Sequence, residues 1–360
     1  MNKIISKQWM IILLSFLILL NSCEEESNTD SFPKDFTGGA FITNEGAYGA
    51  GNGSVSFYSF EKDKLYNDVF KTVNGRVLGD VVQSISIHNE LAFIVVNGSN
   101  KIEVVNAEKF TEVGVITDVA LPRYYIGINQ EKGYVSEWGT GFGTNVKVID
   151  YSTLSVIKTI TVGTGPERMI LLNNLVYVAN SGGWGNDNTI SVIDTETDEV
   201  IKTISLDGDS PRDFVVDTNT DLWVICAGYI DYSDMSETPS KLIRVNTTTN
   251  EVAETITIGE TFHPSNIEIS SDGSSIFYGG GYAVQGIYKM GINENIVPAR
   301  PVIDKSFYGF NIDPETGIIF ALEAPSYTVN GTLWRYEANG TLLGSYEAGV
   351  GPNGAGFSKK

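Results

Sequence analysis

Histidine and cysteine are nearly absent from this chain, since each occurs only 2 times in 360 residues. A zinc site of the Cys/His type is excluded on ligand count, and little is left for catalysis that depends on histidine. The acidic residues are expected mainly on turns and outer strands, so they form no convergent acid/base or metal-binding set. We therefore predict no metal site, no cofactor and no catalytic residues.

Basic residues are also few: 24 Lys and Arg stand against 44 Asp and Glu, which gives a formal net charge of −20. Binding to a nucleic-acid backbone needs clustered Lys and Arg, so nucleic acid is not expected as a partner. The chain is instead rich in Gly (38), Tyr (17) and Phe (17), and 42% of its residues are hydrophobic. This composition is sufficient for a full core and is typical of many short strands joined by turns.

No apolar run near the N-terminus is long enough to cross a membrane. After Lys3 and Lys7, the apolar stretch Trp9–Leu20 would reach roughly 18 Å as a helix, against a hydrocarbon core of about 30 Å. This is typical of a signal peptide, predicted here over residues 1–22. Leu20 to Cys23 resembles the lipobox of bacterial lipoproteins, which implies that Cys23 carries the acyl chains. The alternative is an ordinary secretory signal with a chance cysteine.

Three glutamates, Glu24, Glu25 and Glu26, follow Cys23 directly. They resemble the export signal that sends Bacteroidetes lipoproteins to the outer face of the outer membrane, although a solvated linker would also begin in this way. The polar residues 23–38 are predicted to be a lipidated tether, with the membrane contacted through the lipid anchor only. Cys226 would then have no partner, and we expect it to be a buried thiol at the end of a strand.

The rest of the chain, residues 39–360, repeats. A strand with alternating polarity, a short polar turn and a second alternating strand recur, which is the pattern of a β-hairpin. It is found at Ile102–Ile116, Asn145–Ile160, Asn188–Ile204 and Leu242–Ile256. An aromatic residue in a short apolar strand precedes each hairpin, in the series Phe41, Phe93, Tyr134, Tyr177, Trp223, Phe277 and Phe320. A proline that leads into a further strand follows at Pro122, Pro166, Pro211, Pro264 and Pro352.

These three markers define a unit of four strands and roughly 45 residues, and seven such units fill residues 39–358. Four strands per unit at this period is typical of a propeller blade. The sequence therefore predicts an all-β fold, a seven-bladed β-propeller. Because the chain enters its first blade in the second strand, Gly39–Thr43, the innermost strand of that blade must come from residues 351–358. Such closure leaves no free sheet edge.

The residues Tyr177–Asn180, Ile190–Asp194, Val200–Ile204 and Pro211 resemble the YVTN repeat of surface-layer-type seven-bladed propellers. With its lipobox and acidic leader, the chain also resembles, through architecture and leader alone, a group of surface lipoproteins of gut Bacteroidetes. These capture cobalamin and pass it to a TonB-dependent transporter. The resemblance implies a small-molecule ligand, a corrinoid being one candidate, and a TonB-dependent transporter as partner.

Strand alternation puts the proline loops, and the loops after the aromatic strands, on one face of the propeller, called here the loop face. The tight polar turns, such as Thr195–Thr197 and Ser271–Gly273, fall on the opposite face, the turn face. Aromatic side chains are expected on the loop face at Tyr48, Trp138, Phe142, Trp184, Tyr229, Tyr232, Tyr282 and Tyr327. The proline loops add Arg123, Tyr124, Tyr125, Arg168, Arg212, His263, Phe307 and Tyr308.

Loop tyrosine and tryptophan give large, stiff contact areas, and arginine is a favoured anchor at interfaces. We therefore predict ligand binding on the loop face by these residues, apart from Tyr125 and Phe307. Two local alternatives stay open: each aromatic packs only on its own blade, and Arg123, Arg168 and Arg212 bond to carbonyls between blades. Two other functions also stay open, a propeller hydrolase or lyase and an adhesion or scaffold protein.

Overall fold

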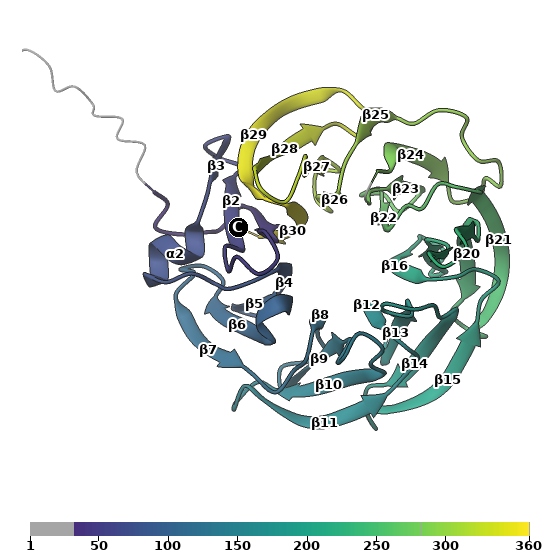
Figure 1. The fold of residues 1–360 in the computed structure, drawn as a ribbon, viewed down its shortest axis with the longest axis horizontal. Helices are drawn as coiled ribbons and strands as arrows, with labels where there is room; N and C mark the ends of the chain where they lie inside the picture. The colour runs from purple at the N-terminus through teal and green to yellow at the C-terminus, as the bar shows by residue number, and fades with distance from the viewer. Residues whose placement is uncertain (1–31, 282, 360) are drawn as a thin grey trace, which may run out of the picture. The chain divides into compact units, whose positions relative to one another are not determined.

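The computed structural model describes residues 32–281 and 283–359, and it divides the chain into residues 1–34 and a compact unit from Asp35 to Lys360. The compact unit is a seven-bladed β-propeller with four antiparallel strands in each blade (Figure 1). This confirms the predicted fold class. Among the described residues, no helix is long and apolar enough to cross a membrane.

Each blade is given from its innermost to its outermost strand. Blade 1 contains β30 (Pro352–Ser358), β1 (Gly39–Asn44), β2 (Ser54–Ser59) and β3 (Lys64–Tyr66). Blade 2 contains β4 (Val82–His88), β5 (Leu91–Val96), β6 (Lys101–Asn106) and β7 (Glu112–Ile116). Blade 3 contains β8 (Pro122–Gly127), β9 (Lys132–Glu137), β10 (Asn145–Asp150) and β11 (Ser155–Thr161). Blade 4 contains β12 (Pro166–Leu172), β13 (Leu175–Asn180), β14 (Thr189–Asp194) and β15 (Glu199–Ser205).

The remaining blades follow the same order. Blade 5 contains β16 (Pro211–Val216), β17 (Leu222–Cys226), β20 (Ser240–Asn246) and β21 (Glu251–Gly259). Blade 6 contains β22 (Asn266–Ile269), β23 (Ser275–Gly279), β24 (Gln285–Gly291) and β25 (Ile303–Ser306). Blade 7 contains β26 (Gly309–Ile312), β27 (Ile319–Glu323), β28 (Asn330–Tyr336) and β29 (Leu342–Val350).

Three short elements interrupt the repeat. The helix α2 (Val69–Asn74) joins blade 1 to blade 2, and the 3₁₀ turn η1 (Asn97–Ser99) follows β5. A two-stranded ribbon, β18 (Ile230–Asp231) with β19 (Ser236–Glu237), rises from the loop between β17 and β20. The sequence predicted only a loop between β17 and β20.

The ring closes as predicted. β30 pairs with β1 in antiparallel register, from Gly39 opposite Ser358 to Thr43 opposite Gly354, with a bulge before Pro352. Closure of this kind removes two unpaired strand edges that would otherwise be exposed. The compact unit begins slightly before the predicted boundary, because Phe36 is buried and its ring lies 5.2 Å edge-on to Phe57.

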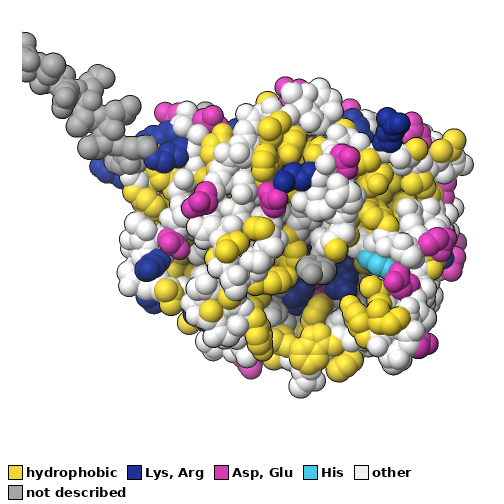
Figure 2. Space-filling view, turned by 45° about the horizontal axis from the view of Figure 1, so that its top comes forward, with side chains coloured by type: hydrophobic (Ala, Val, Ile, Leu, Met, Phe, Trp, Pro, Cys, Tyr) yellow, Lys and Arg dark blue, Asp and Glu magenta, His cyan; other side chains and the backbone are white. Residues whose placement is uncertain are grey.

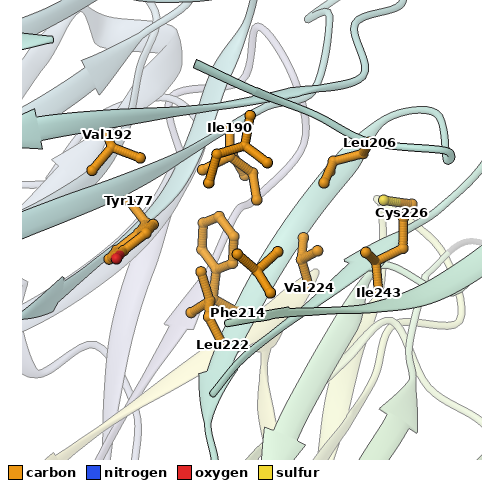
Figure 3. Packing of buried hydrophobic residues seen from close by; sticks show 12 residues of the cluster. Tyr177, Ile190, Val192, Leu206, Phe214, Leu222, Val224, Cys226 and Ile243 are labelled. Atoms are coloured by element: carbon orange, nitrogen blue, oxygen red, sulfur yellow. The ribbon is translucent and has the colours of Figure 1, made fainter. Parts of the chain in front are cut away.

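The hydrophobic core lies between neighbouring blades. Each of the seven marker aromatics is buried, at most 1% exposed, in the second strand of its blade. Between blades 4 and 5, for example, Tyr177 and Ile190 from one sheet pack with Phe214 and Val224 of the next (Figure 3). Cys226 is fully buried in the same cluster, as predicted, and is a free thiol. The recurring aromatic position is thus a core position between neighbouring sheets.

Candidate functional site

A cavity of about 1040 Å³ opens on the loop face, and all seven blades contribute to its wall. Its lining comes from the first residues of the innermost strands and from the loops after the second strands. Figure 2 shows Lys and Arg side chains in dark blue inside this hollow, with hydrophobic side chains in yellow around it. The cavity thus combines a charged interior with an apolar surround.

Arg123, the second residue of β8, is held by groups from the two neighbouring blades. Its Nε and Nη2 donate to the two carboxylate oxygens of Glu167, at 2.9 and 2.6 Å, and its Nη1 donates to Gln83 Oε1 at 2.5 Å. Burial alone would lower the pKa of Arg123, but the Glu167 carboxylate outweighs it and raises the pKa. The alternative left open for Arg123, bonding to backbone carbonyls between blades, is not what holds it: its partners are a carboxylate and an amide side chain.

Arg168, one blade further on, is placed by an aromatic ring and an ion pair, and its buried Nε has no hydrogen-bond partner among the described residues. Its guanidinium lies 4.1 Å from the ring centre of Tyr124, and its Nε is 3.6 Å from Asp213 Oδ1. Burial raises the pKa of Asp213, and Arg168 opposes that rise. The pairing with Asp213 shows that Arg168, too, is bound by a neighbouring blade's carboxylate.

Arg212 differs from the other two arginines. It is the second residue of β16 and lines the cavity. Burial lowers the pKa of Arg212, the Glu167 carboxylate opposes this shift, and the positive charge of Arg123 adds to it. Among the described residues, its guanidinium has no hydrogen bond or ion pair. A guanidinium inside a cavity without a hydrogen-bond or ion-pair partner is a ready binding group.

Trp184 forms an exposed part of the wall, with 65% of its surface accessible. It is positioned by the preceding blade: its backbone N–H donates to Gly141 O at 2.9 Å, and Phe142 lies edge-on to its ring at 6.1 Å. Gly141 has a φ of +102°, and a Cβ there would come within 2.0 Å of the indole. Only glycine therefore allows the indole to lie at this place.

Other parts of the wall carry tyrosines and a histidine. Tyr229 and Tyr232 come from the loop that holds the β18–β19 ribbon. His263 ties this ribbon to blade 6, with Nδ1 2.7 Å from Ala227 O and Nε2 3.1 Å from Glu237 Oε2. Tyr308 and Tyr327 stand edge-on to each other at 6.0 Å, and the Tyr308 hydroxyl donates to Glu45 at 3.3 Å.

Several residues predicted for the ligand site lie elsewhere. Trp138 is only 9% exposed, and the Arg123 guanidinium covers its ring at 4.0 Å, so it supports the arginine from beneath. Tyr48 is 88% exposed and Phe142 57% exposed, and neither is part of the described cavity wall. Tyr282 and Cys23 lie outside the described residues. Tyr125 and Phe307, named with the proline loops, are core residues.

The expectation that acids lie mainly on turns and outer strands is wrong for four residues. Glu45, Glu167 and Asp213 line the cavity, and Glu268 on β22 accepts a hydrogen bond from Asn311 Nδ2 of blade 7 at 2.7 Å. Burial and the neighbouring Asp213 raise the pKa of Glu268 to about 8. The sequence did contain a signal for two of these acids, because Glu167 and Asp213 follow strand-opening prolines within two residues. The innermost strands meet around the axis, so those positions face one another.

The described residues contain no group of three or more His, Cys, Asp and Glu side chains arranged to hold a metal ion. The four acids near the axis are each engaged with an arginine, an amide or a hydroxyl from another blade. What the arrangement offers chemically is a fixed charged interior, one guanidinium without a partner, and an aromatic wall.

Fold and cavity together define a seven-bladed propeller with a large, polar-lined hollow on one face. The chain belongs to the family described as "Domain of unknown function (DUF5074)", whose model matches residues 38–348. No curated protein matches the chain. The narrower YVTN and cobalamin-capture resemblances stay predictions.

Solved structures share the fold at low identity. A quinonprotein alcohol dehydrogenase-like protein from Bacteroides thetaiotaomicron is 16% identical, with a TM-score of 0.66 over 89% of this chain and 78% of that one. The periplasmic gluconolactonase of Pseudomonas aeruginosa is 11% identical, with a TM-score of 0.63 over 88% of this chain and 98% of its own. Because one fold supports many activities, these likenesses concern architecture alone.

Proposed function

We propose that this protein is a cell-surface lipoprotein that captures a large nutrient ligand in its loop-face cavity, without turnover, and delivers it to a TonB-dependent transporter. The observation that carries the proposal is the cavity itself. At about 1040 Å³ it lies at the upper end of the range for ligand sites, roughly 300–1,000 Å³. Such a volume suits a cofactor-sized molecule better than a small metabolite.

The lining supports binding as well. Trp184, Tyr229 and Tyr327 offer aromatic surface to the cavity, and the interior holds charged groups fixed by contacts across blades. A wall whose groups are already fixed costs little entropy to order when a ligand enters. Aromatic surface beside arginine is also the composition found where binding energy concentrates.

Cobalamin is the ligand to test first, followed by haem and siderophores. The experiment is calorimetry on a soluble chain from Ser27 to Lys360, which contains the whole compact unit. Trp184→Ala should weaken binding by roughly thirty-fold, equivalent to about 2 kcal/mol. Thr197→Ala on the turn face is the matched control and should leave the affinity unchanged. If Thr197→Ala weakens binding while Trp184→Ala does not, the assignment of the loop face is wrong.

The same samples distinguish capture from catalysis. After incubation with a bound ligand, mass spectrometry of the released molecule should return the ligand unchanged. Steady conversion into a product would favour the alternative of a propeller hydrolase or lyase. A TonB-dependent transporter gene beside the gene for this protein, and co-purification of the two proteins, would support the delivery step.

The anchor is tested separately, because it lies outside the described residues. Cys23→Ala should release the protein in soluble form, since an acylated cysteine is what holds it to the membrane. Replacing Glu24, Glu25 and Glu26 with alanine should leave the protein lipidated but facing the periplasm. Protease added to intact cells should degrade the natural protein. Protection in intact cells, with cleavage only after lysis, would contradict the surface location.

A further inference from the structure

One of the arginines around the cavity has no hydrogen bond or ion pair among the described residues, although four acids, Glu45, Glu167, Asp213 and Glu237, also line the wall. Three arginines line the cavity, at Arg123, Arg168 and Arg212. Arg123 occupies both oxygens of Glu167, and Arg168 lies beside Asp213. The third arginine therefore faces a cavity in which the nearest carboxylates are already engaged.

The other acids of the wall are engaged too. Glu45 accepts hydrogen bonds from the Tyr308 hydroxyl and, at 3.1 Å, from Asn353 Nδ2. Glu237 lies 3.1 Å from His263 Nε2. No hydrogen-bond acceptor among the described residues pairs with the guanidinium of Arg212.

An arginine in this position destabilises the folded protein unless another group interacts with it. Partial burial of a guanidinium that has no hydrogen-bond partner disfavours its charged form, and burial lowers the pKa of Arg212 although the Glu167 carboxylate opposes the shift. A carboxylate, sulfonate or phosphate group that enters the cavity would supply the missing charge. Arginine binds such groups through two parallel N–H···O bonds, which fixes the orientation of the ligand as well as its charge.

We propose, resting on the function proposed above, that the captured ligand carries an anionic group that binds Arg212, while its ring system lies against the aromatic wall. Trp184 and Tyr229 line the same cavity and offer that wall. The ligand class is thus a large ring-containing molecule with a carboxylate, sulfonate or phosphate group. A neutral molecule of the same shape is excluded as the preferred ligand.

Two fluorescent probes test this directly, because they share one ring system and differ in a single anionic group. 8-Anilinonaphthalene-1-sulfonate carries a sulfonate, whereas N-phenyl-1-naphthylamine lacks it. Each is titrated into the soluble chain from Ser27 to Lys360. We expect the sulfonate probe to bind at least about tenfold more tightly than the neutral one. We also expect Trp184→Ala to weaken both probes, which places them in the cavity.

Arg212→Gln should reduce affinity for the sulfonate probe by about tenfold and change affinity for the neutral probe by less than about twofold. Arg300→Gln is the matched control, since it removes the same charge from an exposed position between β24 and β25 on the turn face. It should change neither affinity. Thermal melting gives a second readout: Arg212→Gln should melt at the same temperature or higher, because it removes an uncompensated charge.

The outcomes separate this inference from the proposed function. If both probes bind in the cavity with equal affinity and Arg212→Gln leaves them unchanged, the anionic class is wrong while capture in the cavity stands. If neither probe binds, capture by this cavity is itself contradicted. A fall of several degrees in the melting temperature of Arg212→Gln would show that Arg212 has a structural partner, which also overturns the inference.

Discussion

The turn face and the loop face are built by opposite rules. On the turn face the bonds that recur from blade to blade lie within single turns: the side chains of Asp194 and Asn246 accept the backbone N–H groups two and three residues on. Asp198 and Asn250 then take a left-handed conformation that ends the turn. On the loop face the polar groups find partners on other blades, as Arg123 and Glu167 do. Hydrogen bonds within single turns give a surface that repeats from blade to blade. Where polar groups depend on partners from other blades, a residue such as Arg212 can remain unpaired.

The largest difference between the faces should appear when an ion pair is broken on each. Glu167→Gln should lower the free energy of unfolding by about 3–5 kcal/mol, because it leaves the buried Arg123 without its carboxylate, close to the charge of Arg212. Unfolding in guanidinium chloride measures this.

The matched change on the turn face is Asp35→Asn, which removes one of the two carboxylate partners of Lys109; the Lys109 and Asp35 side chains are both 50% exposed. It should change stability by less than about 0.5 kcal/mol. Equal losses from the two variants would remove the energetic distinction between the faces.

The pH dependence of stability should have opposite signs for an acid on an innermost strand and an acid on the turn face. The folded protein raises the pKa of Glu268 from 4.5 to about 8, so this group's contribution to stability is present at low pH and is lost as pH rises between those values. Glu268→Gln should therefore be more stable than the natural protein at pH 9, by about 1–2 kcal/mol, and similar to it at pH 4.

Asp272 on the turn face behaves in the opposite way. Hydrogen bonds from Ser270 and Ser274 lower its pKa to about 2, so its contribution is present at neutral pH and is lost as pH falls from about 4 to about 2. Asp272→Asn should remove that acid-side dependence and leave the alkaline side unchanged. Melting temperatures measured from pH 2 to pH 9 check both variants, and slopes of the same sign would contradict the assignment.

A smaller effect is expected where a turn of one blade receives a hydrogen bond from the preceding blade. Tyr177 Oη of blade 4 donates to Asn250 Oδ1 in the turn of blade 5 at 2.6 Å, so Tyr177→Phe should cost about 1 kcal/mol. Tyr278→Phe is the control, because the buried hydroxyl of Tyr278 has no partner among the described residues. The control should be neutral or slightly stabilising, and a loss equal to that of Tyr177→Phe would count against the role of the bond.

The smallest effect belongs to the loop face itself. Tyr48→Ala should change stability by less than about 0.5 kcal/mol and ligand affinity by less than about twofold, since this side chain is 88% exposed and not part of the cavity wall. Calorimetry beside Trp184→Ala measures it. A loss as large as that of Trp184→Ala would extend the binding surface beyond the cavity.

The blade pattern could be predicted because its markers lie close together in the chain. The aromatic in the second strand, the hairpin turn and the strand-opening proline are each read within one unit, and all seven marker aromatics from Phe41 to Phe320 are buried as the pattern required. Closure by Pro352–Ser358 followed from the position at which the chain enters its first blade. The α2 helix and the β18–β19 ribbon were missed because they occur once and have no repeat to reveal them.

The site could be predicted only in part. Arg123, Arg168, Arg212 and Trp184 do line one cavity, since proline loops and second-strand loops share a face. Trp138 shares that loop position, yet it is covered by Arg123. Whether a loop aromatic faces solvent or lies beneath a neighbour depends on the next blade, and no pattern within a unit records it.

The sequence by itself determined the number of blades, their order and the closure of the ring, because each depends on contacts between residues close in the chain or on one repeated period. Tertiary structure alone decided which charges meet. Gln83, Arg123 and Glu167 are separated by 40 and 44 residues along the chain, and they come together only when the innermost strands converge around the axis. That convergence places Arg123 and Arg168 beside carboxylates and leaves Arg212 facing the cavity with no hydrogen-bond or ion-pair partner among the described residues.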